Sequence, residues 1–413
     1  MADPERAAQG GRVYTGATRA ALIAAAVVLG SRLLTFVVAY RASFLPRLGT
    51  IPLGWRFPQR AEVFHGFLGH LLNPWAHWDG VWFLRIAANG YADPHSAAFF
   101  PLYPVAVRGA GWLFGGGLEL GGIVLSLVVF AGCCALLFAL VNADLGPRVA
   151  LLSVVYLALF PTSFFFQAVY SEGLFLLLTL ACFCFARDGR WWLAGLAGFL
   201  ATLTRSAGVL LVVPMLVYYF ERRDWRLART DVQIMAVMLV PAGLAAWMTY
   251  LWQRTGDPLA FSHVQRDWGR AFAAAPLVVW DGVLEAVRGA RQLLWTPPGA
   301  GHPLQSAYFP PTANLLGLPF LVAALGALGA GIRRLPLAYT GYAVVSLLFY
   351  LSFPVRGAPL LSLPRFVIVV FPLFVALAAV SERRRWLRAV IIAVFVLGLV
   401  LLTSRFAAFA WVA

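Results

Sequence analysis

The sequence contains no lysine and few charged residues of any kind. Only 12% of its 413 residues are charged, whereas soluble domains usually carry about a quarter. Hydrophobic residues make up 61% of the chain, and several apolar runs approach the length needed to cross a hydrocarbon core of about 30 Å. The composition excludes an ordinary soluble protein and predicts an all-α polytopic membrane protein.

Cysteine is also scarce. The four cysteines at 133, 134, 182 and 184 lie inside apolar runs, where a thiol behaves as a small hydrophobic group. Neither a disulfide framework nor a zinc site is indicated, and we predict no metal and no cofactor. The first 19 residues are polar, and the apolar run after them has no convincing cleavage site, so we expect a retained first span.

The net charge of +15 comes from arginines that cluster in short segments between apolar runs. This distribution argues against nucleic-acid binding and is typical of cytoplasmic turns in membrane proteins. We predict eleven spans: 20–40, 119–141, 148–166, 170–186, 191–204, 206–220, 232–252, 311–331, 336–353, 364–381 and 387–407.

The arginine clusters predict a topology for a single membrane-embedded domain over residues 1–413. With the N-terminus in the cytoplasm, every arginine-rich turn falls on the cytoplasmic side. Residues 41–98 and 253–310 then form two long external loops, and these loops contain all six histidines. The segment 99–114 cannot be a full crossing and is predicted to be an interfacial helix. If it does cross the membrane, one later span must be lost.

Asp79 is the first candidate for chemistry. It lies in "HWDGVWFLRIAANGY" of the first external loop, next to His77 and Trp78. Aromatic surroundings lower the local dielectric and strengthen interactions of a carboxylate with a cation, which suits a general base. The alternative is that Asp79 caps a helix that begins at Gly80. Both explanations remain open from the residues alone.

Several further charges map to the same external side. Tyr170 and Glu172 lie in "FQAVYSEGLF" at a turn between two spans, where the glutamate either stabilises a helix N-terminus or orients a substrate. Arg205 and Arg365 lie at external ends of apolar runs, where arginine is unexpected. Each either snorkels to the interface or binds an anion such as a lipid phosphate.

Loop residues complete the candidate set. Arg266 is a weaker anion-binding candidate in the second external loop, and His263 lies nearby in the sequence. We predict that His77, Trp78, Tyr170 and His263 also bind substrate. One carboxylate and several arginines on one side of a membrane suit an enzyme that breaks a bond between a sugar and a lipid phosphate. A base would accept the proton of the attacking hydroxyl, and arginines would stabilise the charge on the departing phosphate.

Six sequence blocks resemble one enzyme family. They are "HWDGVWFLRIAANGY" followed by "AFFPLYP", then "FPTSFFFQAVYSEGLFLLLTL", "LTRSAG", "GDPLAF" and "SLPRFVIVVFPLF". In this order they resemble the glycosylphosphatidylinositol mannosyltransferase II family (PIG-V) and its bacterial relatives, over residues from about 75 to 375. The Trp78-Asp79 pair with "AFFPLYP" downstream is the most specific part.

The resemblance implies a GT-C glycosyltransferase fold and an inverting transfer of mannose from polyprenyl-phosphate-mannose to an extracytoplasmic lipid or glycan. Asp79 corresponds to the catalytic acidic residue of the first external loop, and Glu172 matches the Tyr-Ser-Glu position. The composition suggests a bacterial plasma membrane, where the eukaryotic acceptor is not expected. A membrane transporter or lipid flippase is the alternative function, although transporters commonly have internal repeats and none is visible here.

Overall fold

The computed structural model describes residues 4–45, 64–295 and 310–412, which are almost entirely helical. Within these ranges the extended pairing is limited to isolated bridges of Val355 with Arg270 and with Ala358. In the part of the chain that the structure describes, five helices are long and apolar enough to cross a membrane. The prediction of an all-α, multi-pass membrane protein is confirmed.

The α-helices have the following bounds: α1 Pro4–Ala42, α2 Gly66–Leu72, α3 Asp79–Asn89, α4 Leu102–Trp112, α5 Leu118–Leu145, α6 Pro147–Leu159, α7 Glu172–Arg187, α8 Trp191–Thr202, α9 Val212–Glu221, α10 Leu239–Thr255, α11 Ala260–Asp267, α12 Ala275–Trp295, α13 Pro310–Gly331, α14 Leu337–Leu351, α15 Leu363–Val367, α16 Pro372–Ser381 and α17 Arg385–Ala407. The 3-10 helices are η2 Asn73–Ala76, η3 Pro94–Ala98, η4 Ser163–Phe166, η5 Ser206–Leu211, η6 Leu227–Arg229 and η7 Val232–Met238.

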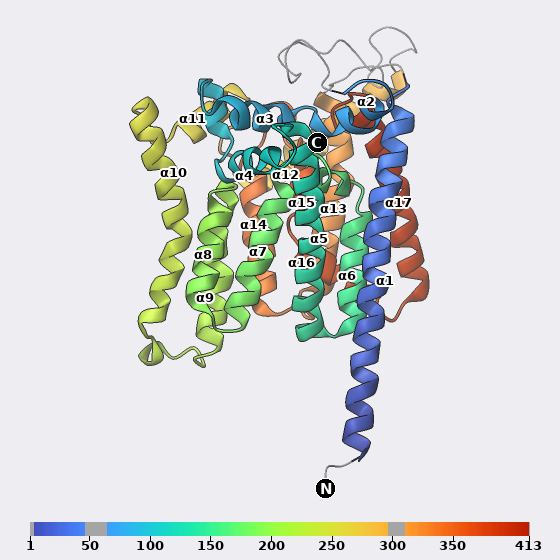
Figure 1. Cartoon of the computed structure of the whole chain (residues 1–413), viewed down its shortest axis with the longest axis vertical. Helices are drawn as coiled ribbons and strands as arrows, with labels where there is room; N and C mark the ends of the chain where they lie inside the picture. Colours follow the sequence, from blue (N-terminus) through green and yellow to red (C-terminus); the bar gives the residue numbers. More distant parts are fainter. Residues whose placement is uncertain (1–3, 46–63, 296–309, 413) are drawn as a thin grey trace.

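Every predicted span coincides with a helical segment, although some segments are short or broken. The five long spans are Ala17–Ala42, Leu118–Leu145, Val232–Thr255, Ala313–Gly331 and Arg385–Ala407. Shorter apolar helices such as α6, α8 and α14 stand beside them in one bundle (Figure 1). The number of eleven crossings therefore stays a prediction, whereas the positions of the helices agree with the hydropathy.

The bundle has two chemically different ends. One end carries the N-terminus of α1 and the arginine-rich turns, and the other carries α2, α3 and α11 (Figure 1). At the arginine-rich end, the Arg222 guanidinium donates to the Arg187 carbonyl at 2.5 Å, and the Tyr339 hydroxyl donates to Asp144 at 2.7 Å. The separation of charge agrees with the pattern expected from the sequence. Which end faces the cytoplasm stays a prediction.

The two predicted external loops contain ordered helices. The first includes α2 and α3, and the second includes α11 and α12. Parts of both loops, 46–63 and 296–309, lie outside the described residues, and so does His302. The predicted helix at 99–114 is present as α4, which packs against α3 and α5. Its interfacial position in a membrane stays a prediction.

The chain is not helical where one span was expected to continue to residue 166. Helix α6 ends at Leu159, and Phe160 adopts an extended conformation with ψ 141°. Phe160 precedes Pro161, and a residue before proline is disfavoured in the helical region. A stretch without α-helix, 160–171, which contains the short 3-10 helix η4, therefore carries the chain to the first turn of α7. We call it the 160–171 segment.

Two side chains of α1 hold the 160–171 segment. Arg32, buried in the bundle, donates to the carbonyl of Ser163 at 2.7 Å and to that of Ala158 at 3.1 Å. The Thr35 hydroxyl donates to the Gln167 side-chain oxygen at 2.7 Å. Carbonyls at the end of a helix lack intrahelical partners, so an arginine is well suited to satisfy them there. These contacts fix the approach to the site described next.

Candidate active site

Four charged side chains from distant parts of the chain meet at one end of the bundle. Asp79 forms an ion pair with Arg365, and Arg365 Nε lies 3.3 Å from Glu172 Oε1. The same Glu172 oxygen accepts a hydrogen bond from Arg205 at 2.6 Å. The result is a continuous chain of alternating charge, Asp79 to Arg365 to Glu172 to Arg205, which we call the four-charge network.

Both carboxylates begin a helix. Asp79 is the first residue of α3, and Glu172 is the first residue of α7. Negative charge is favourable at a helix N-terminus, because unpaired backbone N–H groups and the helix dipole are positive there. The helix-cap alternative for Asp79 is wrong in its strict form, since Trp78 occupies the N-cap position and no side chain caps the helix. The Asp79 carboxylate is instead directed to Arg365.

Trp78 turns the chain into α3 with an unusual backbone conformation. Its φ is +54° and its ψ is −122°, a region that non-glycine residues rarely adopt and that costs about 1–3 kcal/mol. The indole packs against Phe409 and Trp411, with ring centroids 5.5 and 5.0 Å away. Residues near the C-terminus of the chain thus support the turn that aims Asp79 into the network.

Tyr170 links that turn to the 160–171 segment. Its hydroxyl accepts a hydrogen bond from the Asp79 backbone N–H at 3.2 Å and donates to the His77 carbonyl at 3.3 Å. The Arg365 guanidinium lies 5.7 Å from the centroid of the Tyr170 ring, within range of a cation–π interaction. Tyr170 is buried, so in this structure it positions the loop that carries Asp79.

Burial divides the network into two parts. The Glu172 side chain is only 1% exposed, whereas those of Arg365, Asp79 and Arg205 are 10%, 13% and 17% exposed. Glu172 Oε2 is buried and has no hydrogen-bond partner among the described residues. Asp79 Oδ1 likewise accepts no hydrogen bond within the part of the chain that the structure describes. The more accessible members are therefore Asp79, Arg205 and Arg365, which are one carboxylate and two guanidinium groups.

A third guanidinium completes an arginine cluster around Phe366. The guanidinium carbons of Arg205, Arg270 and Arg365 lie 5.6, 5.4 and 5.6 Å from the centroid of that ring. Arg270 donates to the Phe353 carbonyl at 2.9 Å and to the Ser362 hydroxyl at 3.1 Å. Arg270 was not among the residues predicted from the sequence, whereas Arg266 was, although "RDWGR" contains both. Nothing in a loop sequence indicates which of the two folds back onto the bundle.

Arg266 and His263 lie on α11 and are not in the network. Arg266 is exposed and forms no side-chain hydrogen bond or ion pair within the described ranges. His263 Nδ1 lies 2.7 Å from Asp257 Oδ2, and this hydrogen bond lowers the pKa of the Asp257 carboxyl. Their predicted roles in substrate binding remain predictions without support from this geometry.

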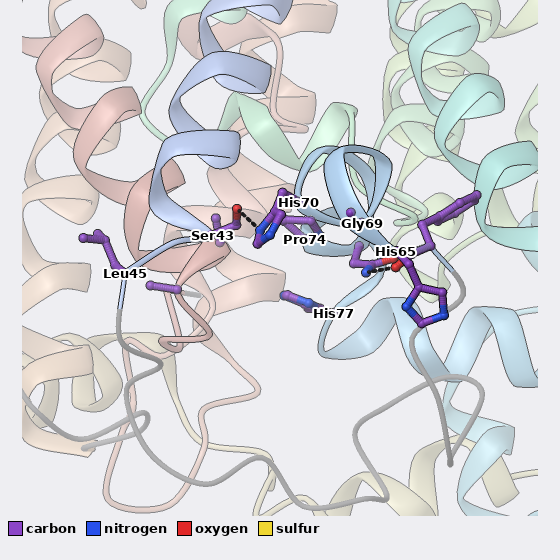
Figure 2. Close-up of a pocket in the computed structure, with 12 residues that line it drawn as sticks. Ser43, Leu45, His65, Gly69, His70, Pro74 and His77 are labelled. Carbon is purple, nitrogen blue, oxygen red and sulfur yellow. Dashed lines mark hydrogen bonds between the residues drawn. The ribbon is translucent and has the colours of Figure 1, made fainter.

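His77 faces a small cavity beside the network. The cavity has a volume of about 130 Å³ and lies between the end of α1, α2 and the region after α17 (Figure 2). His65 and His70 also line it, and His70 Nδ1 lies 3.0 Å from the Ser43 hydroxyl. The His77 ring packs on Phe409 with centroids 3.8 Å apart. Among the described residues, no group of three or more His, Cys, Asp and Glu side chains could hold a metal ion.

The fold and the site define a multi-pass membrane protein with a network of paired charges at one end of its helical bundle. Comparison with known proteins identifies its relatives. Residues 60–253 match the family model described as Mannosyltransferase (PIG-V). The similarity to the PIG-V mannosyltransferases covers a little less than half of the chain. The matched stretch contains Asp79, Glu172 and Arg205, whereas Arg365 lies beyond it.

Curated relatives cover the same stretch. GPI alpha-1,6-mannosyltransferase 2 of Mus musculus is 35% identical over an alignment of 163 residues, which covers 36% of this chain and 31% of the mouse protein. The protein of the same name from Homo sapiens is 32% identical over 161 residues, covering 37% of this chain and 32% of the human protein. The chain thus spans about a third of the length of these relatives.

Two solved structures have a similar arrangement of helices. ArnT from Cupriavidus metallidurans bound to undecaprenyl phosphate has a TM-score of 0.49 and is 15% identical, with coverage of 87% of this chain and 61% of ArnT. The oligosaccharyltransferase of Archaeoglobus fulgidus has a TM-score of 0.45 and is 12% identical, with coverage of 96% and 56%.

Proposed function

We propose that the protein is an inverting GT-C mannosyltransferase. It transfers mannose from polyprenyl-phosphate-mannose to a lipid or glycan acceptor on the extracytoplasmic side of a bacterial plasma membrane. The observation that carries the proposal is the four-charge network, in which Asp79 of the Trp-Asp motif pairs with Arg365, and Glu172 links Arg365 to Arg205. Asp79, Glu172 and Arg205 lie in the stretch that matches the PIG-V mannosyltransferase model, which supports mannose as the sugar.

In the proposed reaction, Asp79 is the general base. An acceptor hydroxyl attacks the anomeric carbon of mannose while the bond from that carbon to the phosphate oxygen breaks. The bonding electron pair stays on the phosphate oxygen, and the hydroxyl proton passes to Asp79. Oδ1 suits this task, because Oδ2 is engaged by Arg365 and Oδ1 accepts no hydrogen bond from described residues. A positioned base typically contributes about 10²–10⁴-fold to the rate.

Arg205 and Arg365 bind the phosphate of the donor. The phosphodiester gains negative charge as it becomes a departing phosphate monoester, and preorganised guanidinium groups stabilise that charge. Glu172 is too buried to touch a sugar at the network surface in this structure. It orients the donor through the arginines, since one of its oxygens contacts both guanidinium groups. The remaining candidates, His77, Trp78 and Tyr170, support the turn that carries Asp79.

Transfer from a labelled lipid donor in detergent tests the proposal. Purified protein is incubated with radiolabelled polyprenyl-phosphate-mannose and a lipid extract of bacterial membranes, and the label is followed by chromatography. We expect the label to leave the donor and to appear in an extract component, with an inverted anomeric configuration. A transporter or flippase would leave the donor intact, because detergent micelles have no second compartment.

The control donor is polyprenyl-phosphate-glucose, which keeps the lipid and the phosphate and changes only the sugar. Faster transfer of mannose than of glucose supports the mannosyltransferase assignment. Transfer of glucose but not of mannose would support a glycosyltransferase and overturn the assignment of mannose as the sugar. An intact mannose donor after incubation with folded, monodisperse protein and extract would overturn the proposed function.

A further inference from the structure

An apolar groove lies beside the site, between α3, α4 and α10. Its volume is about 350 Å³, within the range of pockets that bind small ligands. Val105 and Tyr250 on its walls are 64% and 40% exposed, so the groove is open to the outside of the bundle. The lining residues are Ile86, Ala87, Gly90, Tyr91, Pro101, Pro104, Val105, Arg108, Leu203, Ala246, Trp247 and Tyr250.

Stacked aromatic rings form one wall of the groove. Trp247 is buried and lies parallel to Tyr250, with an interplanar angle of 11° and ring centroids 5.2 Å apart. Tyr91 packs against Trp247 at 4.8 Å, and its hydroxyl donates to the Phe99 carbonyl at 2.8 Å. Because this bond engages the hydroxyl, Tyr91 contributes its apolar ring to the wall of the groove. The groove is therefore preformed and apolar.

Arg108 is the one charged side chain among the described residues that line the groove. Its guanidinium donates to the carbonyl of Ala88, in the last turn of α3, at 3.1 Å. A carbonyl at a helix end needs such a partner. Arg108 thus satisfies the backbone at one edge, and the remaining walls offer hydrocarbon and aromatic surface to a ligand.

The groove connects to the four-charge network along two chain segments. Helix α3 begins with Asp79 and reaches the groove at Ile86 and Ala87, a distance of about 12 Å at a rise of 1.5 Å per residue. Leu203, which also lines the groove, is only two residues before Arg205. A phosphate on the arginines and an attached hydrocarbon chain in the groove therefore fit one extended lipid molecule.

We infer that this groove binds the isoprenoid chain of the lipid-phosphate sugar donor, next to the phosphate. The identity of the donor in this inference rests on the proposed function. The location of its isoprenoid chain rests on the groove itself. An isoprenoid chain offers apolar surface without hydrogen-bonding groups, which matches these walls. The lateral opening allows the chain to enter from the surrounding membrane while the phosphate stays at the network.

Filling the groove tests the inference. Ala246 is exposed and lines the groove, whereas its neighbour Ala245 is also exposed on α10 but does not line it. Ala246→Phe should obstruct the groove without disturbing the core, and Ala245→Phe is the matched control. Binding of a long-chain polyprenyl phosphate and of a ten-carbon analogue is measured for purified protein by native mass spectrometry.

We expect Ala246→Phe to weaken binding of the long-chain lipid about tenfold or more, because losing contact with about two methylene groups changes an equilibrium constant by this factor. Binding of the ten-carbon analogue should change much less, and Ala245→Phe should match the wild type. Equal binding of the long-chain lipid by both variants would overturn the inference. The inference would also be overturned if Ala246→Phe lost bound membrane phospholipid but still bound polyprenyl phosphate, because the groove would then bind phospholipid.

Parallel transfer assays separate this inference from the proposed function. If the wild type transfers mannose and Ala246→Phe raises only the KM for the long-chain donor, the proposed function and the role of the groove are both supported. Transfer that is equal in the two phenylalanine variants would refute the groove and leave the function intact. Loss of long-chain binding in Ala246→Phe, together with no transfer by the wild type, would support the groove and refute the function.

Discussion

Replacing Asp79 by asparagine separates the chemistry of the network from its contribution to stability. Asparagine has nearly the same shape as aspartate, but it cannot accept a proton from an attacking hydroxyl at neutral pH. We expect mannose transfer to fall about 10²–10⁴-fold, the usual contribution of a general base. The wild-type ion pair to Arg365 becomes a hydrogen bond to a neutral amide oxygen.

The structure sets the expected cost in stability. Removing the whole partner of a buried charge typically costs about 3–5 kcal/mol. Arg365 keeps Glu172, whose oxygen lies 3.3 Å from its Nε, and the asparagine oxygen can still accept a hydrogen bond. We therefore expect a loss of only about 1–2 kcal/mol in the free energy of unfolding, since one charged acceptor becomes a neutral one.

The assay combines single-turnover transfer from labelled polyprenyl-phosphate-mannose with thermal unfolding of the same detergent-purified sample. The matched control is Asp257→Asn, which also removes a carboxylate, one that is 39% exposed and pairs with His263. The control should keep full transfer. Near-normal transfer by Asp79→Asn in a folded sample would refute the assignment of the base, and unfolding of that variant would refute the stability argument.

Three further substitutions test the roles of other members. Glu172→Gln replaces the charged acceptor of two guanidinium groups with a neutral amide and should cost about 2–4 kcal/mol in chemical denaturation, roughly twice the cost at Asp79; a cost below 1 kcal/mol would contradict its role as the buried anchor. Arg365→Lys leaves one ammonium that cannot bridge Asp79 and Glu172, and should raise the KM for the donor about 10–100-fold. An unchanged KM would remove Arg365 from the donor site. Arg32→Met leaves carbonyls of Ala158 and Ser163 unsatisfied and should cost about 2–4 kcal/mol, whereas an unchanged melting temperature would show that the 160–171 segment holds without it.

The helical scaffold could be predicted because its signals are local. Long apolar runs and the arginines between them located the apolar helices of the bundle within a few residues, whereas α2, α11 and α12 lie in segments predicted only as loops. The exception at 159–166 came from Pro161, whose effect on Phe160 was overlooked. Hydropathy did not determine how many segments cross the membrane, because several helices are too short to be assigned by length.

The sequence allowed prediction of which residues belong to the candidate site, but not of which of them contact one another. Asp79, Glu172, Arg205 and Arg365 all enter the four-charge network. Their unusual positions at the ends of apolar runs made them visible, since charge near hydrocarbon is costly and needs a reason. Arg266 was the weaker candidate because it lies in a loop, and it is outside the network, since the path of a loop depends on packing that its own residues do not specify.

By itself the sequence determined the membrane class, the positions of the helices and the kinds of charge available at one end of the bundle. Each of these follows from the transfer of short segments between water and hydrocarbon, which depends on local composition. Only the tertiary structure decided that Asp79 pairs with Arg365, 286 residues away, and that Glu172 is buried between two arginines. Those pairings depend on how distant helices pack, and packing fixes which charge loses its water and must find a partner within the protein.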